Sequence, residues 1–222
     1  QADHEIGRLL ASIRDEGQAD NTLVLEIFGD NGGSAEGGPL GHDAKNADGT
    51  TPSVKDRLKI ANALGSEHYL NHYAAAWAWA LTAPFQGTKQ DASHLGGTTD
   101  PLVISWPARF PQAKGLRSQF SHLVDIAPTL YEAAHITSPT TTNSVAQWPL
   151  EGTSLLYTLD QPNAPSRHHV QYFATNGNRS IYANGWWAGI LAQQTWEGPN
   201  GSAYLTQGQH DTHQWELYNL ND

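Results

Sequence analysis

An acid and an amide directly follow an apolar run near the start of the chain. Residues 23–28 read LVLEIF and are followed by Gly-Asp-Asn-Gly-Gly, which places Asp30 and Asn31 just beyond a predicted strand. In open α/β sheets, ligands bind at the carboxyl ends of the strands. A carboxylate and a carboxamide oxygen are hard ligands that suit Ca²⁺ or Mg²⁺, and the glycines leave room for a close approach. The same residues also favour a simple turn, so both interpretations remain open.

The elements that must position this pair follow an α/β order. Residues 3–17 have apolar side chains at helical spacing and predict an amphipathic helix. Residues 21–28 predict a buried strand, which we expect to be parallel to its neighbours. Residues 100–107 predict a second buried strand, and residues 122–135 predict a helix. A helix followed by a strand is typical of an α/β fold.

Composition excludes several classes of function. Acidic residues outnumber basic ones 22 to 12, and the formal net charge is −10. Nucleic acid and an anionic membrane surface are poor partners for a protein with that charge. The chain has no cysteine, so a disulfide, a thiolate metal site and a thiol nucleophile are excluded. No apolar run approaches the ~20 residues of a membrane span.

Four stretches of the chain share their order and spacing with one known family. They are TLVLEIFGDNGGSAEGG, HYAAAWAWAL, PFQGTKQDASHLGGTTDPLVISWPARF and SQFSHLVDIAPTLYEAA. Together they resemble the second half of a bacterial-type arylsulfatase, one of the type I sulfatases in the alkaline-phosphatase superfamily. The chain begins at Gln1 without Met, and we expect it to be a piece of a longer, soluble protein of the bacterial cytoplasm or periplasm.

The resemblance implies an α/β fold in which part of an alkaline-phosphatase-like sheet has flanking helices. We expect residues 1–137 to be the C-terminal part of the sulfatase α/β domain. Residues 138–154 are polar, Thr-rich and bounded by prolines, which predicts a linker or long loop. Short β-like runs within residues 155–222 predict a small C-terminal antiparallel sheet subdomain.

The resemblance also implies roles for four residues. Asp30 and Asn31 correspond to ligands of the active-site Ca²⁺, with Mg²⁺ as an alternative. Lys89 corresponds to a lysine that contacts the sulfate group, and an ammonium suits a tetrahedral oxyanion as a point charge. His94 matches the histidine of the same motif and either lines the pocket or packs beneath it.

The chain departs from the family pattern at three positions near these residues. Thr99 and Asp100 replace an arginine and an asparagine of the familiar stretch, and Gly87 stands where relatives commonly carry an aromatic residue. These changes remove a cation and add an anion close to the predicted site. They leave the substrate preference open.

Sulfatases use a formylglycine nucleophile made from Cys or Ser in a C/S-x-P-S/A-R motif. We expect that motif, and the first pair of metal-binding aspartates, in a missing N-terminal half. Residues 163–167 read NAPSR, and we interpret this imitation as chance. The expected partners are therefore a small sulfate ester and the N-terminal half, without nucleic acid or membrane.

We expect the chain alone to be inactive as an aryl sulfate hydrolase, because it lacks the nucleophile motif. Two other interpretations remain. One is a phosphate or phosphonate monoester hydrolase of the same superfamily. The other is a non-catalytic binding or assembly module that retains the fold.

Overall fold

A computed structural model describes most of the chain and divides it into two compact units. It describes residues 2–29, 31–41, 53–69, 71–192 and 214–221. Unit 1 comprises Gln1–Ile27 and Leu102–Gln171, and unit 2 comprises Phe28–Pro101 and Tyr172–Asp222. Each unit therefore combines segments that are distant in the sequence. The sequential division into residues 1–137, 138–154 and 155–222 stays a prediction.

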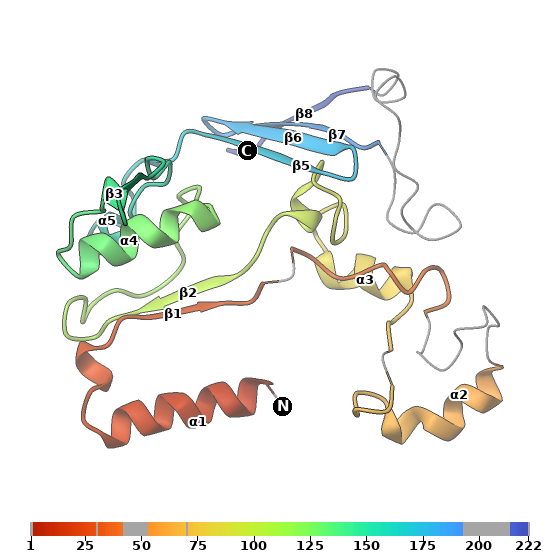
Figure 1. The fold of residues 1–222 in the computed structure, drawn as a ribbon. Coiled ribbons are helices and arrows are strands. Elements are labelled where there is room, and N and C mark those ends of the chain that lie inside the picture. Colours follow the sequence, from red (N-terminus) through yellow and green to blue (C-terminus); the bar gives the residue numbers. More distant parts are fainter. Residues whose placement is uncertain (1, 30, 42–52, 70, 193–213, 222) are drawn as a thin grey trace. The chain divides into compact units, whose positions relative to one another are not determined.

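Unit 1 begins with a helix and a two-stranded sheet (Figure 1). The helix α1, Ala2–Asp15, confirms the predicted amphipathic helix. Strand β1, Val24–Ile27, pairs with strand β2, Leu102–Ser105, so that Val24 lies opposite Ser105. Both strands lie where the apolar runs predict them.

The expected direction and burial of these strands were wrong. The pairing of β1 with β2 is antiparallel, because the chain returns to the carboxyl end of β1 and starts β2 there. The N–H of Phe28 donates to the carbonyl of Pro101 at 3.1 Å and extends the pairing by one step. The residues of both strands are half-buried or exposed rather than buried, since this sheet has two strands within the described residues.

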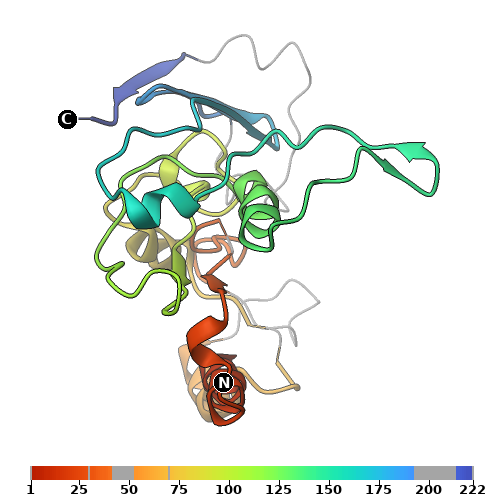
Figure 2. The same ribbon diagram turned by 90° about the vertical axis from the view of Figure 1, so that its left-hand side faces the viewer.

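The remainder of unit 1 includes a helix that follows a capped 3₁₀ turn. Helix α4, Ile126–Ala133, follows the short 3₁₀ turn η5, Leu123–Asp125, and confirms the predicted helix. His122 and Asp125 form a reciprocal capping box at the start of η5. The other elements are η1 Ala19–Asn21, β3 Thr141–Thr142, β4 Val145–Ala146 and α5 Leu156–Asp160. The β3–β4 hairpin is exposed and lies at the end of a long excursion from α4 (Figure 2).

Unit 2 carries the small antiparallel sheet predicted for the C-terminal region. Its strands are β5 Val170–Thr175, β6 Asn178–Ala183, β7 Trp186–Ile190 and β8 Glu216–Asn219, in the order β5-β6-β7-β8. The first two residues of β5 belong to unit 1. The pairs β6–β7 and β7–β8 are antiparallel. Asn-Gly pairs at 176–177 and 184–185 have positive φ values and form the tight turns before β6 and β7.

The helices of unit 2 are short. They are α2 Val54–Ile60, η3 Ala61–Ala63, α3 Ala75–Thr82 and η4 Leu95–Gly97. Ala78 of α3 is fully buried, whereas the indoles of Trp77 and Trp79 are exposed. Within the described part of the chain, no helix combines the length and apolarity needed to cross a membrane.

Candidate active site

Asn31 is held by two hydrogen bonds from one short segment. Its backbone N–H donates to Oδ1 of Asp100 at 2.7 Å. Its side-chain Nδ2 donates to the carbonyl of Gly97 at 3.2 Å. Asn31 has φ 43°, in the left-handed region that non-glycine residues rarely adopt. Asp30, the other predicted metal ligand, lies outside the described residues.

The glycines after Asn31 allow two loops to pack backbone against backbone. Gly32 has φ 98°, and a Cβ there would overlap the carbonyl oxygen of Gly96. The N–H of Lys89 donates to the carbonyl of Gly33 at 3.0 Å. From the sequence, these glycines were expected to leave room for a ligand. The space at Gly32 is instead filled by the neighbouring loop.

The backbone of Lys89 therefore packs beside the segment that directly follows Asn31. Lys89 is half-buried, and its N–H contacts that segment at Gly33. Two of the sequence motifs thus meet within unit 2, where the hydrogen bond from Lys89 to Gly33 joins residues that are 56 positions apart. The contact of the Lys89 ammonium with a sulfate group stays a prediction.

The C-terminal sheet supports the loop that carries Lys89. Ser180 Oγ of β6 donates to the carbonyl of Ala92 at 2.5 Å, and the indole N–H of Trp187 of β7 donates to the carbonyl of Ser93 at 2.8 Å. Both side chains are buried. This support was not predictable from the sequence, because bonds to carbonyls 88 and 94 residues away leave no local pattern.

The loop before His94 also has its own internal bonds. Asp91 is fully buried, and its Oδ2 accepts from the N–H of Thr88 at 2.9 Å and from its hydroxyl at 3.2 Å. Gly87 has φ 87°, and a Cβ there would lie 3.0 Å from Cβ of His94. The glycine that departs from the family pattern therefore suits the local backbone.

His94 is buried and links this loop to strand β8. Its Nδ1 lies 2.8 Å from Ser93 Oγ, and its Nε2 lies 3.3 Å from Oε2 of Glu216. The Tyr218 ring contacts the imidazole edge-on, and its hydroxyl donates to the Glu216 carboxylate. These contacts favour the packing interpretation over direct contact with a ligand. The catalytic assignment of His94 stays a prediction.

The same cluster shifts two pKa values. The hydrogen bond from Tyr218 is the main cause that lowers the pKa of Glu216, with a smaller contribution from His94. That bond to the carboxylate raises the pKa of Tyr218 to about 12. Glu216 is thus an ionised acceptor at neutral pH, which suits its position beside the His94 ring.

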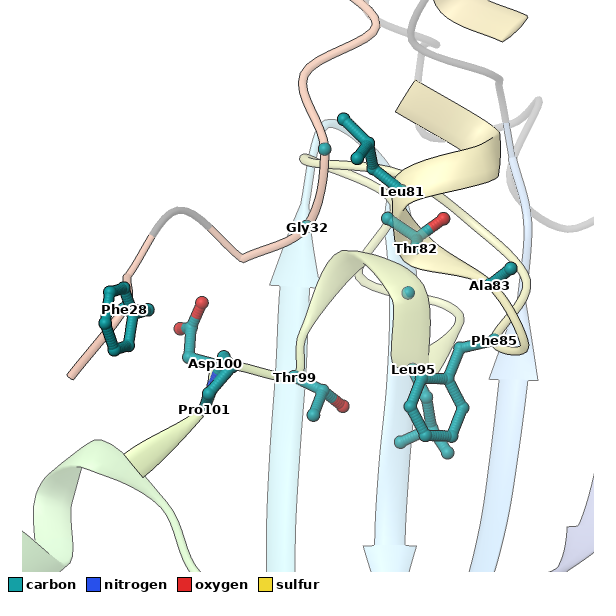
Figure 3. A pocket seen from close by; sticks show the side chains of 12 residues that line it. Phe28, Gly32, Leu81, Thr82, Ala83, Phe85, Leu95, Thr99, Asp100 and Pro101 are labelled. Carbon is teal, nitrogen blue, oxygen red and sulfur yellow. The ribbon is translucent and has the colours of Figure 1, made fainter. Parts of the chain in front are cut away.

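A cavity of about 310 Å³ in unit 2 is lined by Gly32, the residue after Asn31, and by Asp100 (Figure 3). Its lining is mostly apolar, and the acidic side chain on it is Asp100. Thr99 also lines it, so two of the positions that depart from the family pattern meet here. The lining side chains include Phe28, Leu81, Phe85, Leu95 and Pro101.

The oxygen atoms at Asn31 and Asp100 are of the kind that bind a hard cation. The described residues alone do not supply a complete set of ligands. Because Asn31 Nδ2 faces the carbonyl of Gly97, the amide oxygen occupies the other branch of the side chain. The Asp100 carboxylate is a second hard oxygen group beside it. Among the residues that the structure describes, no group of three His, Cys, Asp or Glu side chains could hold a metal ion.

Comparison with known families identifies the class of the protein. Residues 1–136 match the family model described as Sulfatase. The chain therefore belongs to the sulfatase family, within the alkaline-phosphatase superfamily, and the predicted α/β fold class is confirmed. Its function is that of a sulfatase-like hydrolase, a class that generally uses a divalent metal and a formylglycine. The match includes Asn31, Lys89 and His94.

Proposed function

We propose that the chain serves in the Ca²⁺-dependent hydrolysis of aryl sulfate esters, with Mg²⁺ as the alternative cation. Asp30 and Asn31 are the proposed cation ligands, and Lys89 is the proposed sulfate contact. The observation that carries the proposal is the packing of the Asn31 and Lys89 loops, whose backbones meet where Lys89 N–H donates to Gly33. That packing places two segments of the family motif side by side in unit 2.

The proposed roles follow from the chemistry of the groups. A bound divalent cation supplies positive charge that offsets the charge of the sulfate oxygens. Asn31 offers a neutral oxygen whose orientation the bond to Gly97 fixes. The Lys89 ammonium adds a point charge suited to a tetrahedral oxyanion. His94 acts as a positioning residue, because its ring joins the Lys89 loop to Glu216.

The nucleophile lies outside this set of residues. The chain has no cysteine, and we place the formylglycine in an N-terminal half of the enzyme. We therefore propose that the chain as it stands hydrolyses no aryl sulfate. Its Ca²⁺ affinity is expected to be weak, since Ca²⁺ takes about six to eight oxygen ligands.

Binding of the ester to the chain itself tests this proposal. The ¹⁵N-labelled chain is titrated with 4-nitrophenyl sulfate in the presence of CaCl₂, and the backbone amide shifts are followed by NMR. We expect shifts at Asn31 and Lys89 that Lys89→Ala abolishes. Lys114→Ala is the matched control, because Lys114 is exposed and lies in unit 1.

The same titration separates the alternatives. Stronger binding of 4-nitrophenyl phosphate than of the sulfate would favour a phosphate monoester hydrolase. Equal shifts in the Lys89→Ala and Lys114→Ala variants would contradict the role of Lys89. The absence of any shift with either ester would favour a non-catalytic module.

A further inference from the structure

We infer that Asp100 is a positioning residue that holds Asn31 in the conformation needed to present its amide oxygen to a cation. The inference rests on the proposed function, because it takes Asn31 to be a cation ligand. The contact between Asp100 and Asn31 does not depend on that role. Asp100 stands where the family stretch carries an asparagine. The structure gives this acid a defined partner 69 residues earlier in the chain.

Asp100 accepts a hydrogen bond from the backbone of Asn31. At 2.7 Å, the contact of Asn31 N–H with Asp100 Oδ1 has the short length of a charge-assisted hydrogen bond. Asn31 has φ 43°, in the left-handed region, which is one of several conformations open to asparagine. An acceptor that fixes the N–H direction selects this one. Asp100 therefore sets the backbone conformation from which the Asn31 side chain leaves.

The same segment also fixes the side chain of Asn31. The carbonyl of Gly97 accepts from Asn31 Nδ2 at 3.2 Å, only three residues before Asp100. One bond thus directs the backbone of Asn31, and the other decides which branch of the carboxamide carries the oxygen. A ligand oriented in advance loses less entropy when it binds. The pair of bonds makes Asn31 a preorganised oxygen donor.

Asp100 has mostly apolar surroundings. It is half-buried and lies at the edge of the apolar cavity beside Phe28 and Thr99 (Figure 3). Its carboxylate points toward the stretch of chain that runs to Gly32 (Figure 3). The neighbouring Pro101 is fixed by the hydrogen bond from Phe28 N–H to its carbonyl. Apolar surroundings strengthen a hydrogen bond between a carboxylate and an amide.

The Asn31 amide of the metal-free chain tests the contact directly. We expect its proton resonance to lie downfield in the parent and to move upfield in Asp100→Ala. The upfield shift should be smaller in Asp100→Asn, which retains an acceptor without the charge. Asp15→Asn, an exposed acid at the end of α1, is the control. If Asp100→Ala does not fold, Asp100→Ser gives the same comparison, because its hydroxyl is attached one atom closer to the backbone. An Asn31 resonance unchanged in the truncated variant would overturn the inference.

A Ca²⁺ titration by calorimetry tests the purpose of the contact. Groups that orient a metal ligand typically affect affinity by about 10- to 100-fold, so Asp100→Ala should weaken binding by at least about tenfold. Asp100→Asn should recover most of that loss. Equal affinities of the parent and Asp100→Ala would overturn the positioning role. A parent chain without Ca²⁺ binding would instead overturn the proposed cation role of Asn31, while the amide spectrum would still decide whether Asp100 holds Asn31.

Discussion

The imidazole of His168 and the carboxylate of Asp125 form a buried pair in unit 1. Nδ1 of His168 lies 2.8 Å from Oδ1 and 3.0 Å from Oδ2 of Asp125. Asp125 is fully buried, and it also accepts from the backbone N–H groups of His122 at 2.8 Å and Thr153 at 2.7 Å. One carboxylate thus joins three segments of the chain: the start of α4, the segment before α5 and the approach to β5.

Removal of this carboxylate is predicted to destabilise unit 1 strongly. Asp125→Ala leaves His168 and two backbone donors without their acceptor, and each buried donor that loses its partner costs about 1–3 kcal/mol. The free energy of unfolding from urea denaturation is the measurement. Asp15→Ala, at the exposed end of α1, should change it by less than about 0.5 kcal/mol. Equal stabilities of the two variants would contradict the structural role of Asp125.

The stability of the chain is predicted to fall as the pH drops below about 6.5. Burial lowers the pKa of His122, and the charge of His168 lowers it further, against an opposing effect of Asp125. The folded state therefore prefers neutral His122, whose Nδ1 accepts from Val124 N–H at 3.3 Å. The penalty is absent above the ordinary pKa of 6.5, grows as the pH falls toward the lowered value, and is complete below it.

An asparagine at position 122 isolates this effect. His122→Asn keeps a side chain that can cap η5 and removes the titrating group. Thermal melts between about pH 8 and pH 5 should show that the parent loses stability relative to this variant as the pH falls. Parallel pH profiles for the two proteins would show that His122 is not the group responsible.

Gly32→Ala is predicted to separate the Asn31 loop from the Lys89 loop. A methyl group at Gly32 would overlap the carbonyl oxygen of Gly96, and φ 98° adds backbone strain. Gly38→Ala is the matched control, because Gly38 has φ 67° with nothing within 4 Å of the added Cβ. The strain alone costs about 1 kcal/mol, so the additional loss of unfolding free energy in Gly32→Ala measures the packing. Equal losses in both variants would contradict the close contact of the loops.

Trp187→Phe is predicted to loosen the loop that carries Lys89. The variant keeps an aromatic ring but removes the indole donor, which leaves the buried carbonyl of Ser93 without this bond at a cost of about 1–3 kcal/mol. Amide hydrogen exchange of residues 88–94 should become faster. The corresponding change in the exposed neighbour, Trp186→Phe, should leave the exchange rates unchanged. Faster exchange in both variants, or in neither, would count against support by Trp187.

Local patterns in the sequence predicted much of the fold. The apolar spacing of residues 3–17 corresponds to α1, and the β-like runs after residue 169 correspond to β5 through β8. The direction of β1 against β2 was not predictable in this way. An apolar run has the same composition in either direction, and the path of the chain between the two strands decides how they pair.

The contacts around the site were predictable only in part. The motif identified Asn31 and Lys89 as members of one site, and the structure brings their backbones together through Gly33. The sequence shows Asp100 as a departure from the family pattern. Its bond to Asn31 was not predictable, because it spans 69 residues and has no local signature. The pairing of Asp125 with His168 is likewise a long-range contact, which a single sequence does not reveal.

The proposed function assigns the cation ligands and the sulfate contact to this chain, and the nucleophile to an N-terminal half. The most direct test is the turnover of a chromogenic aryl sulfate with Ca²⁺, measured for the chain alone and for the chain combined with a sulfatase N-terminal half that carries formylglycine. We predict turnover only in the combination, with a loss of more than about 100-fold when the chain carries Asp30→Ala. Turnover by the chain alone that Asp30→Ala abolishes, or a combination that Asp30→Ala leaves fully active, would contradict the account.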